Sequence, residues 1–141
     1  MGTIPTELRH LRSLSELFVL KFISNKINII FILMHLFVFF IERIDFGDND
    51  LTGTVPTQLE HLTRLETLYL EGDKLSRTIL LEIGIMNKLQ YLALQQNNLS
   101  GSFPFQIVDA TELKELALDN NRLTGSISTS IGQLNKFKNC K

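Results

Sequence analysis

The chain has 141 residues, of which 44% are hydrophobic and 21% charged, and its formal net charge is −1. This length and apolar content are enough for one domain with a continuous core. The balanced charge gives no general reason to expect nucleic acid as a partner, because proteins that bind it carry basic patches. The three histidines are far apart and have no cysteine or carboxylate at ligand spacing, so we predict no metal site and no cofactor.

Residues 2–14 read as the second half of a repeated unit whose full form appears further along the chain. They begin with Gly-Thr-Ile-Pro and continue with leucines three residues apart. No phosphate-binding glycine loop and no nucleophile elbow is present in the chain. We therefore predict a partial repeat at 2–14 and no enzymatic activity.

An apolar stretch, residues 15–41, interrupts the repeats. If this stretch is removed, Leu14 joins Glu42 in the register of the repeats. Three interpretations remain open: translated non-coding sequence, a degenerate repeat in which Asn25 holds the conserved polar position, or a membrane span within 18–41. The last is disfavoured by its lysines, because a lysine at the centre of a span costs roughly 2.5–3.5 kcal/mol.

Residues 41–141 contain four copies of a 24-residue unit and a truncated fifth, with no gap between them. The copies begin at Ile41, Leu65, Leu89 and Leu113, and each follows the template L-x-x-L-x-L-x-x-N-x-L-x-G-x-I-P-x-x-L-x-x-L-x-x. A strict period of this length indicates a solenoid, in which every unit buries its apolar edge against its neighbours. The alternating x-L-x-L-x segment predicts one short strand per unit, and stacked units predict a parallel sheet.

A polar residue at the ninth position of each unit points into this apolar stack. The four residues are Asn49, Asp73, Asn97 and Asn121. A side-chain amide both donates and accepts, so a column of asparagines can satisfy the backbone groups where each strand turns away. We interpret this column as a structural ladder. An ionised carboxylate only accepts, so we expect the turn beside Asp73 to be the least satisfied.

Glycine at position 13 and proline at position 16 mark the bend that returns the chain along the opposite side. Glycine tolerates backbone angles that other residues resist, and proline fixes its own φ. The unit that begins at Leu65 has Arg77 and Leu80 at these positions. We expect its outer side to be irregular, with Leu80 and Leu81 free to pack or to remain exposed.

The sequences LYLEGDKL (68–75), NNLSGSFP (97–104) and NNRLTGSI (120–127) resemble the plant-type leucine-rich repeat, which is distinguished by its added L-x-G-x-I-P stretch. The resemblance covers about 100 residues. It implies an α/β fold: a curved leucine-rich-repeat solenoid with one short parallel strand per repeat and an irregular or short helical convex side. It also implies a receptor-like or inhibitor-like protein without catalytic residues in its repeats. Because the chain starts and stops within a unit, we expect a fragment of a larger protein.

Three functions follow from this resemblance as hypotheses. The first is a module that recognises a protein or peptide on its concave face. The alternatives are the ectodomain of a receptor-like kinase and an inhibitor of a secreted hydrolase. No signal peptide precedes the repeats, so an extracellular or cell-surface location rests on the resemblance alone. Asn98 begins an N-glycosylation sequon, and the single cysteine, Cys140, holds a core position where we expect a buried thiol.

The residues beside the strand positions should line the concave face. They include seven acidic and two basic residues, a balance of −5 that favours a cationic or polar partner. Tyr69 and Tyr91 project from adjacent strands, and aromatic residues are common binding anchors. An alternative is that this face is only a solvated strand surface. The candidate ligand-binding residues are Glu66, Tyr69, Glu71, Tyr91, Gln95, Lys114 and Asp119.

Overall fold

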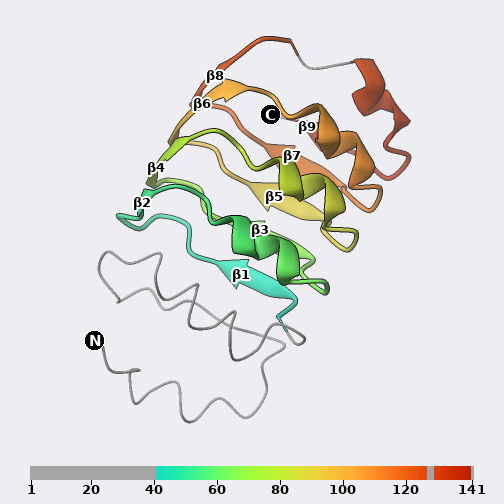
Figure 1. The fold of residues 1–141 in the computed structure, drawn as a ribbon, viewed down its shortest axis with the longest axis horizontal. Coiled ribbons are helices and arrows are strands. Elements are labelled where there is room, and N and C mark those ends of the chain that lie inside the picture. Colours follow the sequence, from blue (N-terminus) through green and yellow to red (C-terminus); the bar gives the residue numbers. More distant parts are fainter. Residues whose placement is uncertain (1–40, 127–128, 141) are drawn as a thin grey trace.

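The computed structural model describes residues 41–126 and 129–140. The predicted partial repeat at 2–14 and residues 15–40 of the apolar stretch lie outside these ranges. In the described part the chain winds into successive coils that lie side by side, with strands along one side and short helices along the other (Figure 1). The expected curved solenoid is confirmed, and its repeats stack in sequence order.

One strand from each coil forms the main sheet, which is parallel and has the order β1-β3-β5-β7-β9. Each strand residue pairs with its equivalent in the next repeat, so Ile44 lies opposite Leu68, which lies opposite Leu92. Side chains at equivalent repeat positions therefore form columns across the sheet. The strands are β1 (Arg43–Asp45), β3 (Thr67–Tyr69), β5 (Tyr91–Ala93), β7 (Glu115–Ala117) and β9 (Asn139–Cys140).

A second parallel sheet, which the sequence did not predict, follows the turn in each repeat and has the order β2-β4-β6-β8. Its residues pair two positions short of the repeat period, as in the pairs Thr52–Lys74 and Ser76–Asn98. This sheet is therefore staggered relative to the first. Its strands are β2 (Thr52–Gly53), β4 (Lys74–Arg77), β6 (Asn98–Ser102) and β8 (Arg122–Thr124).

A short 3-10 helix occupies the convex side of each repeat. Pro56 and Pro104 precede two of these helices with φ of −74° and −70°. Leu80 precedes another with φ of −65°, the value that proline would impose. The expected irregularity in this repeat is wrong, because Leu80 adopts the required angle without proline. The helices are η2 (Thr57–His61), η3 (Leu81–Ile85), η4 (Phe105–Asp109) and η5 (Thr129–Gln133).

The core lies between the sheets and the helices and consists of the apolar columns. Leu68, Leu75 and Leu99 are at most 1% exposed. Burying a leucine contributes roughly 1.5–3 kcal/mol, so these columns dominate the stability of the stack. Leu80 packs partly against the core, whereas Leu81 is 55% exposed.

At the last described coil, Cys140 pairs in register with Leu116, but its side chain is exposed. The expected burial of this thiol is wrong, since no described repeat lies beyond β9 to cover it. Within 41–126 and 129–140 no helix combines the length and apolar character that crossing a bilayer requires. The membrane interpretation of 18–41 concerns residues outside this part, apart from Ile41.

Candidate functional site

The outward face of the main sheet carries the residues beside the buried columns. Tyr69 ends β3 and Tyr91 begins β5, and both side chains are partly exposed. Because alternate residues of a strand point to opposite faces, Leu68 and Leu92 enter the core while their neighbours face outward. The period of two thus presents both aromatic rings on one surface.

A hollow of about 410 Å³ opens on this surface. The fifth repeat position is Ala93 in β5 and Ala117 in β7, whereas β3 has Tyr69 at the same position. The small alanine side chains leave the space that a larger residue would fill. The polar and aromatic lining residues are Tyr69, Glu71, Tyr91, Gln95, Gln96, Glu115, Asp119 and Asn139.

Five of the seven candidate ligand-binding residues line this hollow, namely Tyr69, Glu71, Tyr91, Gln95 and Asp119. Glu66 and Lys114 do not line it. The two alanines were not among the candidates. The signal that could have identified them is a small residue at a position that is large in the preceding repeat.

The lining contains three carboxylates, on Glu71, Glu115 and Asp119, and no lysine or arginine. The nearby cations are engaged at its border. The Arg43 guanidinium lies 4.7 Å from the centre of the Tyr69 ring, and the Lys114 ammonium lies 5.6 Å from that of Tyr91. Such cation–π contacts fix the cations beside the hollow, which leaves the hollow itself acidic.

The Glu71 carboxyl group lies over the backbone of the preceding repeat. A Cβ atom added to Gly47 would come within 2.6 Å of Glu71 Cδ, so the glycine makes room for this group. Burial raises the pKa of Glu71, and the negative charges of Asp45 and Asp48 raise it further. Its Oε2 is buried without a hydrogen-bond partner, as is Oε1 of Gln95 in the next repeat. Two acceptors on this face therefore lack donors.

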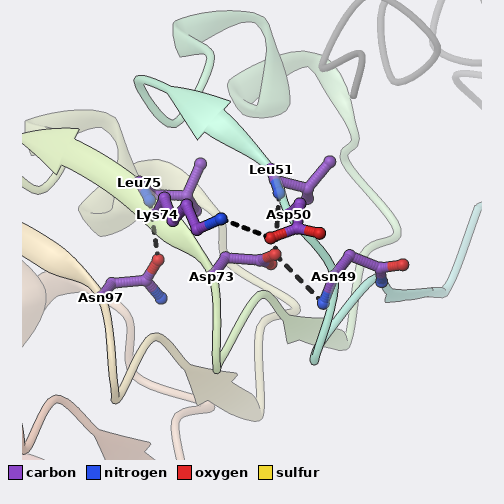
Figure 2. Close-up of polar contacts among 7 residues, drawn as sticks. All are labelled: Asn49, Asp50, Leu51, Asp73, Lys74, Leu75 and Asn97. Atoms are coloured by element: carbon purple, nitrogen blue, oxygen red, sulfur yellow. Dashed lines mark hydrogen bonds and ion pairs between the residues drawn. The ribbon is translucent and has the colours of Figure 1, made fainter. Parts of the chain in front are cut away.

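Beneath the turns, Asn97 connects neighbouring repeats by hydrogen bonds (Figure 2). Its Oδ1 accepts from the Leu75 N–H at 2.9 Å, and its Nδ2 donates to the Leu70 carbonyl at 2.7 Å. Asn121 makes the equivalent contacts to the Leu99 N–H and the Leu94 carbonyl, at 2.9 and 2.8 Å. Each amide thus joins two coils and uses both its acceptor and its donor.

Asp73 occupies the same position with a different set of contacts (Figure 2). Its Oδ1 accepts from the N–H groups of Leu51 and Asn49, at 2.9 and 3.1 Å, while its Oδ2 is buried without a partner. The Leu70 carbonyl at this turn is satisfied by Asn97. The missing hydrogen bond that we expected at this turn is therefore one to Asp73 Oδ2.

The described residues offer no group of three or more histidine, cysteine, aspartate or glutamate side chains arranged to hold a metal ion. Of the three carboxylates of the hollow, Glu71 comes from the repeat that begins at Leu65, and Glu115 and Asp119 come from the repeat that begins at Leu113. Their negative charges make the electrostatic potential of this part of the concave face negative.

Comparison with protein families matches residues 112–134 to the leucine-rich-repeat model. The comparison with curated proteins gives no match. Among solved structures, the chain is similar to the leucine-rich-repeat ectodomain of the plant membrane receptor kinase GASSHO1/SCHENGEN3 from Arabidopsis thaliana. The two are 36% identical over 69% of this chain and 12% of that one, with a TM-score of 0.67.

Two other solved structures show comparable similarity. The ectodomain of the Arabidopsis receptor kinase HAESA is 33% identical over 72% of this chain and 17% of that one, with a TM-score of 0.67. A plant ice-binding protein is 29% identical over 72% of this chain and 33% of that one, with a TM-score of 0.69. The chain therefore spans a third or less of the length of these three proteins.

Proposed function

This chain is a leucine-rich-repeat protein, and on that premise we propose that it is a recognition module that binds a protein or peptide ligand on its concave face. The observation that carries the proposal is the hollow between Tyr69 and Tyr91, with its acidic lining. Tyrosines supply large contact areas at low entropic cost and are frequent binding anchors. In this proposal the chain has no catalytic role of its own.

The chemistry of the hollow favours a ligand with a basic side chain. Three carboxylates and the faces of two aromatic rings would surround a lysine or arginine placed there. Glu71 and Gln95 both line the hollow, and each has a side-chain oxygen without a donor that the N–H groups of a ligand could satisfy. Glu115 and Asp119 are exposed and stand at the entrance. Their charge would attract a cationic segment over a longer range.

The similar structures support a receptor ectodomain as the wider setting of this module. HAESA was solved with the peptide hormone IDA and a co-receptor, and GASSHO1/SCHENGEN3 with CASPARIAN STRIP INTEGRITY FACTOR 2. These ligands belong to those proteins. For this chain we propose an analogous peptide ligand and an extracellular location.

In an extracellular setting Asn98 is the candidate glycosylation residue. It is the first residue of β6 in the second sheet and is half-buried. Leu99 and Ser100 follow it, as the sequon requires. It is not among the residues that line the hollow. A mass decrease on enzymatic deglycosylation of secreted protein, absent in Asn98→Gln, would establish the modification.

The binding proposal is tested by selecting ligands from a phage-displayed library of random dodecapeptides against the purified chain. We expect the enriched peptides to carry lysine or arginine. Their affinity should fall at least tenfold when Tyr69 and Tyr91 are both replaced by alanine, since truncating a buried aromatic anchor costs about 2 kcal/mol or more. Isothermal calorimetry with synthetic copies of the peptides measures the change.

The matched control is Leu81→Ser, which removes an exposed apolar side chain from the convex side. This variant should bind the selected peptides as tightly as the unmodified chain. Equal affinity for the double tyrosine variant and the unmodified chain would contradict the assignment of the concave face. Selection of acidic or uncharged peptides would contradict the proposed ligand chemistry.

A further inference from the structure

Asp73 is a carboxylic acid at a position where the neighbouring repeats use an amide. Its side chain is 7% exposed, as is that of Asn97. The Asn97 amide nitrogen donates to the carbonyls of Leu70, Leu94 and Gln95, at 2.7, 3.2 and 3.3 Å. One repeat earlier, the corresponding carbonyls belong to Phe46, Leu70 and Glu71. Each of these carbonyls already accepts one bond, from Asn49 Nδ2, Asn97 Nδ2 and the Asp48 N–H respectively, and an ionised Asp73 cannot donate a second bond to any of them.

The two oxygens of this carboxyl group have unequal surroundings. Oδ1 accepts two backbone N–H bonds, whereas Oδ2 is buried and has no hydrogen-bond partner (Figure 2). A backbone carbonyl can accept two bonds, and the Leu94 carbonyl already does so from Asn97 and Asn121. A proton on Oδ2 would therefore convert an unpaired acceptor into the donor that this ladder position lacks.

The charges around Asp73 also favour a proton. Asp48, in the turn after β1, and Glu71, in the turn after β3, both face it with like charge. Lys74, the next residue in the sequence, is exposed and is bound to Asp50 by an ion pair. Burial is the largest effect and, together with these carboxylates, raises the pKa of Asp73 to about 6, against the opposing effect of the two backbone N–H bonds.

We propose that Asp73 is a proton-binding member of the ladder, which takes up a proton from solvent in mild acid and then donates from Oδ2 to a carbonyl of the adjoining turns. The protonated form contributes an additional donor at this ladder position, whereas the ionised form leaves Oδ2 as a buried acceptor without a partner. The repeats are therefore held together more firmly in mildly acidic solution than at neutral pH. This inference concerns the inside of the solenoid and does not rest on the proposed ligand.

The sign of the effect follows from proton linkage. The pKa of this carboxyl group is 3.8 in the unfolded chain and about 6 in the folded chain. Between these values the folded state binds more protons, so the stability contributed by Asp73 is full at low pH and is lost as pH rises through 6. From below pH 3.8 to well above pH 6, a pKa difference of this size corresponds to a decrease in the folding equilibrium constant on the order of a hundredfold, of which about tenfold falls between pH 5 and 7.5.

The test compares the full chain with Asp73→Asn by thermal and urea denaturation from pH 5 to 7.5. At pH 7.5 the variant should melt several degrees higher, because the amide supplies the missing donor without charge. The difference should shrink steadily toward pH 5, where Asp73 in the unmodified chain is largely protonated. Asp109→Asn, which neutralises an exposed carboxylate at the end of η4, is the matched control and should leave the pH profile of the unmodified chain unchanged over this range.

A direct measurement is the carbon-13 NMR titration of the Asp73 carboxyl group in the folded chain. A midpoint near 6 supports the proposal, and one near 4 overturns it. A stability difference between Asp73→Asn and the unmodified chain that stays constant from pH 5 to 7.5 would also overturn it. That outcome would mean that asparagine merely packs better at this position.

Discussion

The repeats that begin at Leu65 and Leu89 have the same elements in the same register but differ at the positions that define the family pattern. The second follows the pattern and the first departs from it three times. The differing pairs are Asp73 and Asn97, Arg77 and Gly101, and Leu80 and Pro104.

Both repeats have a strand in the main sheet, a strand in the second sheet and a 3-10 helix. Arg77 reaches φ of 71°, close to the 84° of Gly101, although an arginine resists this region. What the repeats share is their apolar columns: Leu68, Leu75, Leu92 and Leu99 are all at most 2% exposed. The columns therefore set the path of the chain. Residues that differ from the repeat pattern outside the columns leave this path unchanged and cause only local strain, as at Arg77, or an unpaired group, as at Asp73.

The largest expected effect is in the shared columns. Leu68→Ala and Leu92→Ala each remove a side chain that is at most 2% exposed, and each should cost roughly 2–5 kcal/mol in free energy of unfolding. Urea denaturation followed by circular dichroism measures both losses. A loss for one variant that is twice the loss for the other would break the equivalence of the two repeats.

The next largest effect is expected at the ladder, where the side chains of Asn97 and Asp73 can be removed in turn. Asn97→Ala leaves the Leu75 N–H and the Leu70 carbonyl without their side-chain partner, at roughly 1–3 kcal/mol for each buried group. Asp73→Ala should cost less at pH 7.5, because it also removes a buried charge with one unpaired oxygen. Unfolding midpoints in guanidinium at this pH decide the order. A greater loss for Asp73→Ala would show that its two N–H bonds outweigh the burial of its charge.

The smallest effect concerns the bend. Arg77→Gly should stabilise the chain by about 0.5–1 kcal/mol, since it relieves an unfavourable φ at an exposed position. Gly101→Ala should destabilise it by about 1–2 kcal/mol, because an added Cβ would lie 2.7 Å from Thr78 Cγ2 at a φ of 84°. Differential scanning calorimetry of both variants measures the shifts. A stabilising Gly101→Ala would refute the account of this turn.

The main sheet could be predicted from the sequence, because its register depends only on the spacing of the repeats. The alignment of Ile44 with Leu68 and Leu92 follows from the 24-residue period. The second sheet could not be predicted in this way, because its strands pair two positions short of that period and their sequence shows no clear alternation. The convex helix after Leu80 was missed for another reason: a residue other than proline can adopt the φ that proline imposes.

Part of the candidate site could also be predicted from the sequence, and part could not. The positions of Tyr69 and Tyr91 on one face follow from strand periodicity. The hollow beside them depends on which side chains are missing, and this becomes visible only when Ala93 and Ala117 are placed next to Tyr69 in adjacent coils.

The architecture follows from the 24-residue period, because a period that returns apolar side chains to the same column leaves few other ways to bury them. The partners of the remaining polar groups, in contrast, depend on how the coils meet in space. The partners of the Asp73 carboxylate are backbone N–H groups of the preceding coil, and carboxylates of neighbouring turns raise its pKa. Cys140 holds a core register and is nevertheless exposed, because no described coil covers it. Repetition along the chain specifies neighbours in general, whereas hydrogen bonds and charges depend on the atoms that meet across each junction.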